Sequence, residues 1–416
     1  MSSITVPVKK IEQVFTVGSL IFFTDPIALY RFISDVFLGG RFNTRSLLWS
    51  IVVTMTVLFF GLRFKKIFYV IKKNKTSAAI LVVLLLFIVL SCLWSASPSL
   101  SYKRFTSLFL VSLFGIYFAT RFELEEQLRL LSYALFLCTF LSVIMALLLP
   151  EYGIMGMGKE LAIGGQEAVH EGIWRGIYSH KNPLGRIMAL SGLALFLFAS
   201  DKSNRKWAWL GFALSIGILL ASQSATALCI LITCSILTKV YQNLRWDIRL
   251  MVPLSIITVV TLGGLMTLVA SNTETILNAL GRDITLSGRT ELWSAVLSEI
   301  WQSPWLGYGY KGYWVGWNGP SAVIWSQFPW LPPHAHNGVL NVWLELGVLG
   351  LLLFTASFVF ASAQAVIYVR ETKLMYGLFP VIYLTFYFLF NLTESALIGD
   401  NIFWVLYIST FLLKRG

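Results

Sequence analysis

Histidine is the side chain best suited to hold and release a proton near neutral pH, and this chain has four. They are His170, His180, His334 and His336. All lie in or just beyond two long segments between apolar stretches, 150–182 and 271–335. The spacing His334-Ala335-His336 allows a general base, an interfacial hydrogen bond or a metal site. Because no Cys, Asp or third His lies nearby in the sequence, we predict no bound metal.

Two arginines are suited to binding phosphate, because a guanidinium can form paired hydrogen bonds to phosphate oxygens. Arg289 stands in the first turn of an amphipathic helix expected over 287–301, with Ser287 as N-cap. Free N–H groups at a helix start also favour an anion. Arg186 lies within an apolar stretch, where charge is costly and usually functional. A lipid-headgroup contact and a structural ion pair are the respective alternatives.

The composition requires a membrane. Hydrophobic residues make up 57% of the 416 residues, charged residues 12%, and mean hydropathy is +0.74. These values exclude an ordinary soluble enzyme, a disordered chain and a coiled coil. The net charge of +12 is attributed to basic cytoplasmic loops rather than to nucleic-acid binding. The four cysteines lie in apolar stretches, where they act as small hydrophobic residues.

We therefore predict an all-α polytopic membrane protein with about twelve spanning helices and short amphipathic helices in a large outer loop. The apolar stretches are roughly 14–34, 46–62, 77–95, 104–120, 127–149, 183–200, 207–222, 224–240, 250–270, 347–368, 374–391 and 395–413. Both termini are expected in the cytoplasm, because 20 of 32 basic residues then lie inside, six of them in loop 63–76. The first stretch is expected to be a spanning helix of the protein rather than a signal peptide that is removed.

This topology divides the chain into five parts. They are helices 1–5 (1–149), a periplasmic loop (150–182), helices 6–9 (183–270), a large periplasmic loop with the catalytic motifs (271–346), and helices 10–12 (347–416). The spacing of Gly153, Gly158 and Lys159 resembles a nucleotide-binding loop, but Glu160 replaces the magnesium-binding Ser or Thr. No Asp-x-Asp occurs, so neither a nucleotide nor a nucleotide-sugar site is expected.

Together these motifs resemble the O-antigen ligase and polymerase family of bacterial membrane glycosyltransferases. The family's pattern is His-Asn, nine residues, then Gly-x-x-Gly, which here is His336, Asn337, Gly347 and Gly350. Further similar elements are 288–293, 304–309, 391–395 and 403–404. The resemblance covers about 170–404, whereas the first 150 residues match in hydropathy alone.

The resemblance implies a reaction without metal or cofactor. A glycan on undecaprenyl pyrophosphate is the donor, and the hydroxyl of an acceptor glycan or of lipid A–core attacks it at the periplasmic face of the inner membrane. His336 would orient or deprotonate the acceptor, and Arg289 would bind the pyrophosphate. Arg186 or Arg175 would be the second arginine, and the spacing leaves both open. The implied substrate-binding set is Arg186, Arg175, Lys181, His180, Asn182, His334, Asn337, Glu345 and Glu394.

Three functions compete. Segment 174–186 resembles the exopolysaccharide-polymerase branch and favours polymerisation of repeat units. An O-antigen ligase is the alternative within the family, and a transporter or flippase of lipid-linked glycans the alternative outside it. No internal repeat of the transporter type is found. Aromatic residues in 302–333 form either a sugar-binding wall or an interfacial belt. Membrane lipid and other polysaccharide-assembly proteins are the remaining expected partners.

Overall fold

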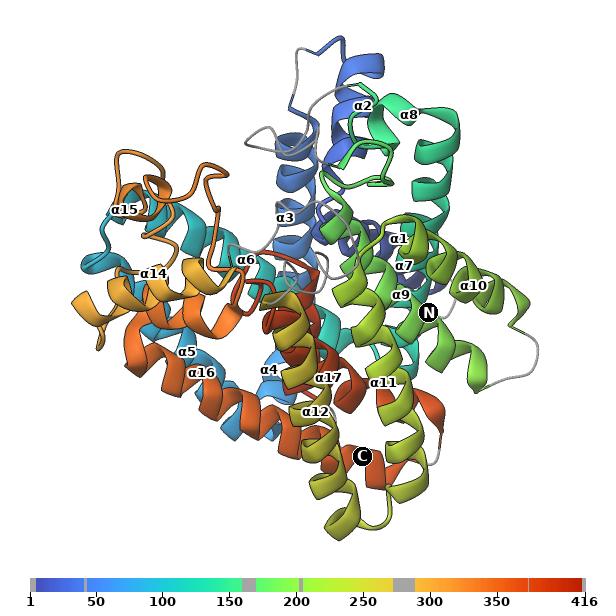
Figure 1. Ribbon diagram of the computed structural model, residues 1–416. Helices are drawn as coiled ribbons and strands as arrows, with labels where there is room; N and C mark the ends of the chain where they lie inside the picture. The colour runs from blue at the N-terminus through green and yellow to red at the C-terminus, as the bar shows by residue number, and fades with distance from the viewer. Residues whose placement is uncertain are drawn as a thin grey trace.

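The computed structural model describes residues 5–40, 43–158, 170–201, 205–271, 289–372 and 374–413. Within them the regular structure is helical, with one isolated bridge between Ile154 and Trp174, so the all-α prediction is confirmed (Figure 1). The longer helices are α1 (Thr5–Phe23), α2 (Ile27–Phe37), α3 (Thr44–Leu62), α4 (Phe64–Lys73), α5 (Lys75–Leu90), α6 (Pro98–Arg121), α7 (Leu124–Leu148), α9 (Lys181–Ser200), α10 (Lys206–Ala221), α11 (Ala225–Leu244), α12 (Ile248–Ser271), α14 (Arg289–Gln302), α16 (Gly338–Glu371), α17 (Phe379–Asn391) and α18 (Ile402–Phe411). Shorter turns are α8 (Pro150–Gly153), α15 (Ala322–Trp325), η1 (Ser91–Leu93) and η3 (Met375–Leu378).

The helices establish a multi-pass membrane protein. Among the described residues six helices are long and apolar enough to cross a bilayer, namely α3, α5, α7, α9, α11 and α16. A seventh span is formed if α1 and α2 are counted together. Each of the other predicted stretches also contains a helix, but α10, α17 and α18 are shorter, and the apolar run counted within α12 is Ile248–Thr258. The count of twelve therefore stays a prediction.

The first apolar stretch, 14–34, departs from the continuous helix predicted for it. The chain bends by 105° between α1 and α2. Pro26 has no N–H to donate to the helix, and Asp25 before it adopts a left-handed φ of 58°. Prediction from hydropathy missed this break because one proline and one aspartate barely change the average over twenty apolar residues.

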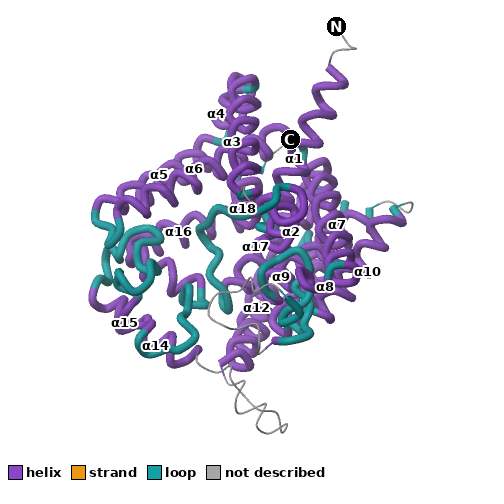
Figure 2. Tube along the Cα trace, turned by 90° about the horizontal axis from the view of Figure 1, so that it is seen from above, coloured by secondary structure: helices purple, strands orange, loops and turns teal. Residues whose placement is uncertain are grey.

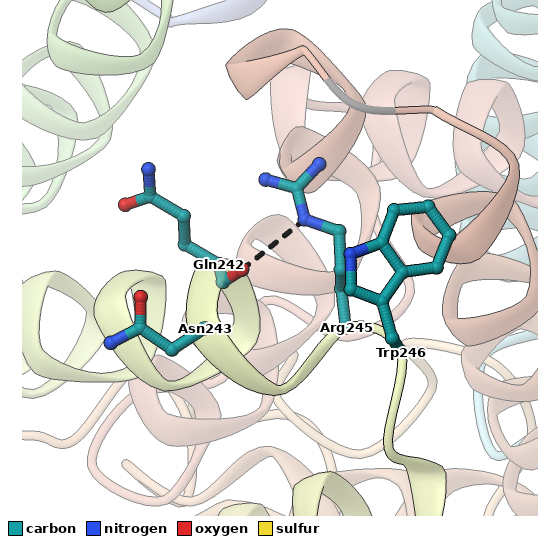
Figure 3. Close-up of a pocket in the computed structure, with 4 residues that line it drawn as sticks. All are labelled: Gln242, Asn243, Arg245 and Trp246. Carbon is teal, nitrogen blue, oxygen red and sulfur yellow. Dashed lines mark hydrogen bonds between the residues drawn. The ribbon is translucent and has the colours of Figure 1, made fainter.

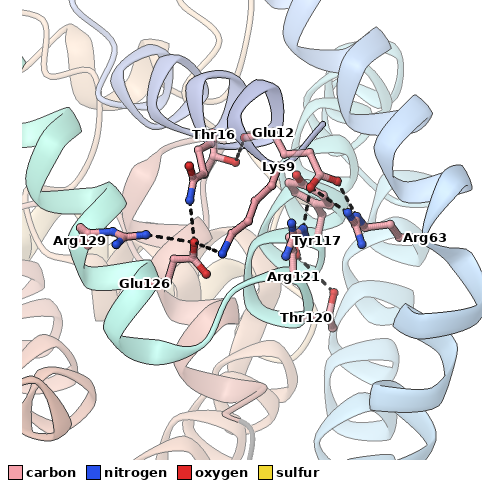
Figure 4. A network of polar contacts seen from close by, with 10 residues as sticks. Lys9, Glu12, Thr16, Arg63, Tyr117, Thr120, Arg121, Glu126 and Arg129 are labelled. Carbon is pink, nitrogen blue, oxygen red and sulfur yellow. Dashed lines mark hydrogen bonds and ion pairs between the residues drawn. The ribbon is translucent and has the colours of Figure 1, made fainter. Parts of the chain in front are cut away.

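Charged side chains join helix ends that the topology assigns to the cytoplasm (Figure 4). Glu12 of α1 is almost fully buried and accepts hydrogen bonds from Arg63, at 2.8 Å, and Arg121, at 2.7 Å. Glu126 of α7 accepts from Gln13 and pairs with Lys9. Removing one partner from a buried ion pair typically costs about 3–5 kcal/mol. These contacts therefore fix α1, α3, α6 and α7 to one another.

A similar junction lies at the end of α11. Arg245 donates to the backbone oxygen of Thr372, and an adjoining hollow of about 680 Å³ is lined by Gln242, Asn243, Arg245 and Trp246 (Figure 3). The start of α11 lies beside the start of α9, because a Cβ on Gly185 would meet Ser224. Twenty residues of helix separate the two ends by roughly 30 Å. This hollow is therefore remote from the predicted site residues around α9.

The segments assigned to the outer side also contact one another. Backbone N–H groups of Ala28 and Leu29 donate to the oxygen of Ile177 at 3.0 and 3.3 Å, and Ala96 donates to Tyr308 at 3.0 Å. Figure 2 shows the loops gathered around α8 and around α14 and α15. The helix bundle thus brings the two long loop segments and the ends of α5, α9 and α17 together.

The amphipathic pattern of α14 predicts a helix that lies on the membrane surface. In the structure its apolar face packs on protein instead. Its apolar face, Leu292, Val296 and Ile300, is fully buried in a second core. The partners in that core include Tyr313, Trp314, Ile324 and Leu344. The N-cap predicted at Ser287 lies outside the described residues. The same spacing suits either surface, so the pattern alone could not distinguish protein from lipid.

A break in α16 joins this second core to the bundle. Gly347 has φ 65° and ψ −176°, which interrupts the helix and frees backbone groups on either side. Tyr308 N–H donates to Leu344 O at 3.0 Å, and Val348 N–H donates to Pro304 O at 2.8 Å. The Gly-x-x-Gly element and segment 304–309 therefore meet by main-chain pairing, which gives both motifs a structural reason.

Replacing Gly347 with Ala should destabilise this junction. A Cβ there would lie 2.1 Å from the backbone oxygen of Trp305, and the left-handed φ adds strain. We expect the free energy of unfolding to fall by about 2–4 kcal/mol, measured by thermal or denaturant unfolding of detergent-purified protein. Gly217→Ala in α10 is the matched control, because nothing lies within 4 Å of its Cβ position. Equal stability of the two variants would refute the role given to the break.

Candidate functional site

The site begins with the turn His334-Ala335-His336, immediately before α16. Asn337 caps the helix, since its side chain accepts from the N–H groups of Val339 and Leu340 at 3.0 and 3.1 Å. His336 has a left-handed φ of 49°, and its N–H donates to Nδ1 of His334 at 3.2 Å. The ring centroids are 4.1 Å apart. The turn thus holds two imidazoles against each other at the helix start.

A carboxylate from a distant segment faces both histidines. Glu394 follows α17, and its Oε2 lies 3.8 Å from His336 Nδ1 and 3.9 Å from His334 Nε2. Asn182, 212 residues earlier at the start of α9, donates to the other carboxylate oxygen at 3.4 Å. Asn391 shapes the Glu394 loop by accepting from Ala396 N–H at 2.6 Å. Three segments therefore converge here.

The two arginines add positive charge to this cluster. Arg186 lies over the rings of Phe390 and Phe403, with 5.7 Å from Cζ to each centroid. Its Nε, Arg289 Nη1 and both ring nitrogens of His336 are buried without a hydrogen-bond partner among the described residues. Leaving a buried polar atom unsatisfied costs about 1–3 kcal/mol, and more for charged groups. Such a concentration of unsatisfied donors points to a bound anion.

Burial, together with the neighbouring positive groups, favours the neutral form of His336. Burial, then the neighbouring His334, Arg289 and His180, lower the pKa of His336 well below its ordinary value. Burial also lowers the pKa of His334, and Arg186 and Arg289 add to this effect while Glu394 opposes it. A neutral imidazole can accept a proton at neutral pH. The geometry thus combines an available base with groups that attract negative charge.

Some residues of segment 174–182 lie close to the histidine cluster, and others stabilise the surrounding fold. His180 caps α9 by accepting from Asn182 N–H at 3.3 Å and lies close enough to affect His336. Lys181 begins α9 and is half-buried. Arg175 is fully buried, and its guanidinium donates to the backbone oxygens of Tyr152 and Glu151 at 2.6 and 3.0 Å. Of the two arginines that the sequence left open, Arg186 is therefore the one beside the histidines.

Comparison with known proteins shows which proteins this chain resembles. Residues 210–355 match the family model of O-antigen ligases. Over 193 residues the chain is 30% identical to the exopolysaccharide production protein ExoQ of Rhizobium meliloti, which covers 43% of this chain and 44% of that protein. Over 132 residues it is 28% identical to a "Putative polysaccharide ligase" of Rickettsia felis, covering 30% and 32% of the two chains.

The chain is thus similar to the O-antigen ligase family over residues 210–355 and to two polysaccharide-related proteins over part of its length. The matched segments cover less than half the length of either relative. The O-antigen ligase match includes Arg289 and His336, whereas Arg186 and Glu394 lie outside it. The structure places all four residues in one cluster.

The aromatic residues of 302–333 serve mostly as core. Tyr310, Tyr313 and Trp314 are buried, whereas Trp305 and Trp317 are exposed and not placed at the histidines by any described contact. Trp330 is half-buried, and its ring centroid lies 5.5 Å from that of His336. Of the predicted wall, Trp330 is therefore the residue that lies beside His336.

His334, His336 and Glu394 also offer three possible metal-ligand atoms within 4.8 Å of one another. Sequence reasoning missed this because Glu394 comes from a distant segment. Two imidazoles and a carboxylate suit zinc, but the guanidinium groups of Arg186 and Arg289 disfavour an added cation. The donor set as a whole is better matched to an anion.

Inorganic pyrophosphate should bind purified protein through Arg186 and Arg289. Each Arg→Lys change retains the charge but loses the paired donors, so affinity should fall about tenfold or more. Isothermal titration calorimetry in detergent measures it, with the exposed Arg31→Lys as control. Unchanged affinity in both pocket variants would exclude this anion site.

Proposed function

We propose that this protein transfers a glycan from undecaprenyl pyrophosphate to an acceptor hydroxyl without a metal or cofactor. The observation that carries the proposal is the meeting of a neutral His336 with the unsatisfied buried nitrogens of Arg186 and Arg289. Similarity to the O-antigen ligase family supports a role in polysaccharide or O-antigen assembly. A lipid-linked pyrophosphate is the leaving group that this charge distribution would assist.

The proposed reaction assigns a task to each group. The acceptor oxygen bonds to the anomeric carbon as the bond from that carbon to the pyrophosphate oxygen breaks. His336 takes the hydroxyl proton, and the electron pair leaves with the lipid pyrophosphate. The two guanidiniums stabilise its developing charge. Glu394, 3.8 Å from His336, stabilises the imidazolium that results.

The proposal places this chemistry at the periplasmic face of the bacterial inner membrane, with both termini in the cytoplasm. Loops 150–182 and 271–346 then contribute to the site, and the spans in 1–149, 183–270 and 347–416 support it. The contacts among helix ends favour this division, since groups assigned to one side pair with others of that side.

We favour polymerisation of lipid-linked repeat units. The similarity to ExoQ, which is described as an exopolysaccharide production protein, supports this choice, as does segment 174–186. Ligation to lipid A–core is the second candidate, because both the family model and the second relative are described as ligases. The donor chemistry is common to both.

Purified protein in liposomes with one undecaprenyl pyrophosphate-linked repeat unit tests the function directly. A polymerase should produce a ladder of products on a gel, and the ladder should persist in EDTA. No ladder until lipid A–core is added would identify a ligase. Loss of activity in EDTA with recovery in Mg²⁺ or Mn²⁺ would contradict the metal-free reaction. Movement of intact substrate across the bilayer, with no product, would indicate a transporter.

Acidification should abolish transfer only below the ordinary histidine pKa of about 6.5. The pKa of His336 is lowered, so its base form persists through pH 6.5, and kcat/KM should fall at lower pH as the ring is protonated. Arg289→Gln removes a neighbouring positive charge and should move this acid limb to higher pH.

His336→Ala should lower kcat about 10²–10⁴-fold, and His334→Ala should have a milder effect. The two variants serve as each other's control for expression and insertion. Near-normal turnover by His336→Ala would remove the general-base assignment.

A further inference from the structure

Two polar residues on α16 hold the histidine turn without facing the site. Asn341 Oδ1 accepts from the N–H of Ala335, between the two histidines, at 3.3 Å, and from Trp314 Nε1 at 2.9 Å. Asn341 Nδ2 donates to Glu345 Oε1, one helical turn later, at 2.8 Å. Because its oxygen already has two donors, the orientation of the Asn341 amide is fixed.

Glu345 extends this connection to a second loop. Its Oε2 accepts from Lys311 N–H at 2.9 Å, and Lys311 Nζ pairs with Asp400 Oδ1 at 3.0 Å. Arg104 donates to the backbone oxygen of Lys311 at 2.6 Å, which anchors the loop to α6. Both oxygens of Glu345 are therefore committed to structural partners.

These contacts connect the histidine turn to the segment between α17 and α18. Asp400 belongs to the same inter-helix segment, between α17 and α18, as Glu394. That segment also reaches the histidine turn directly, because Ser395 Oγ accepts from Asn337 N–H at 3.2 Å. The histidine turn and the Glu394 segment are thus linked twice, once through Ser395 and once through Asn341, Glu345 and Lys311.

The space beside Glu345 is too small for a sugar. A cavity of about 20 Å³ is lined by Glu345, Asn341, Tyr310 and Ser395 among others. This volume suits a single water, not a pyranose ring. Glu345 was expected from the sequence to bind substrate, but its burial and its paired oxygens give it a different task.

The histidine turn needs such support. A left-handed φ at a non-glycine residue costs of order 1–3 kcal/mol and persists only where surrounding contacts enforce it. His336 has such a φ and lies near Arg289, whose positive charge repels a protonated ring. The contact from Asn341 to Ala335 N–H is one that enforces this turn, beside the bond from Trp293 Nε1 to Ala335 O at 3.0 Å.

We propose that Asn341 and Glu345 are positioning residues that hold His336 in line with the acceptor and relay the placement of the Lys311–Asp400 pair. The effect that this inference predicts on kcat rests on the proposed function. It assigns neither residue a contact with substrate.

Exchanging the amide and the carboxylate between positions 341 and 345 tests the positioning role of Asn341 and Glu345. Asn341→Asp alone sets two carboxylates against each other, and Glu345→Gln alone leaves one donor facing another donor. Each should lower kcat about tenfold or more with little change in donor KM. Asn341→Asp with Glu345→Gln restores every hydrogen bond, with donor and acceptor reversed only in the bond between the two side chains, so kcat should recover to within about threefold of the parent protein. Asn243→Asp, an exposed amide at the far end of α11, is the matched control.

A second measurement does not depend on transfer activity. Diethyl pyrocarbonate modifies accessible neutral imidazoles, and peptide mass spectrometry follows His336 by itself. Both single variants should speed modification of His336 several-fold, and the double variant should slow it again. If the parent protein lacks transfer activity but this pattern holds, the proposed function fails and the positioning role stands. If the single variants change neither kcat nor the modification rate, or the double variant recovers neither, the positioning role is overturned.

Discussion

An apolar helix bundle imposes a cost on every charge and every unpaired polar atom that it encloses, and the two ends of this molecule meet that cost differently. Near Glu12 one carboxylate is neutralised by Arg63 and Arg121. At the other end, nitrogens of Arg186, Arg289 and His336 stay buried without partners among the described residues. Pairing at the first end produces a rigid junction. At the second end, an anionic ligand would be favourable because it would pair with these unsatisfied nitrogens.

The same requirement applies to the backbone. Interrupting α16 at Gly347 would leave main-chain groups unpaired in apolar surroundings, and segment 304–309 supplies their partners. This pairing fixes the first turns of α16 against the second core, so the Asn337 cap and the histidine turn acquire a defined place. A helix without the break would carry the histidines but could not dock them against α14, where Trp293 donates to Ala335 O at 3.0 Å.

Sequence patterns predicted much of this arrangement. Hydropathy located helices in all the apolar stretches, and residue type singled out His336 and the arginines. Hydropathy averages could not reveal the bend at Pro26, and periodicity could not tell whether α14 packs on lipid or on protein. Glu394 was selected by motif alone, and its approach to both histidines depends on packing between α17 and α16. Asn341 and Lys311 carried no signal, because a half-buried amide and a loop lysine are ordinary residues until their partners are known.

In the proposed reaction, Glu394 would offset the charge that His336 acquires. If His336 takes up a proton while Arg186 and Arg289 stay charged, three positive groups share a buried space, and their repulsion would oppose the proton transfer. Glu394 faces both imidazoles and offsets one of these charges. In the proposed reaction, once the bond from the sugar to the pyrophosphate has broken, the same carboxylate would favour release of the pyrophosphate by repulsion. A site with two arginines and no acid would bind the leaving group more strongly and release it more slowly, so the single carboxylate would balance stabilisation of the developing charge against product release.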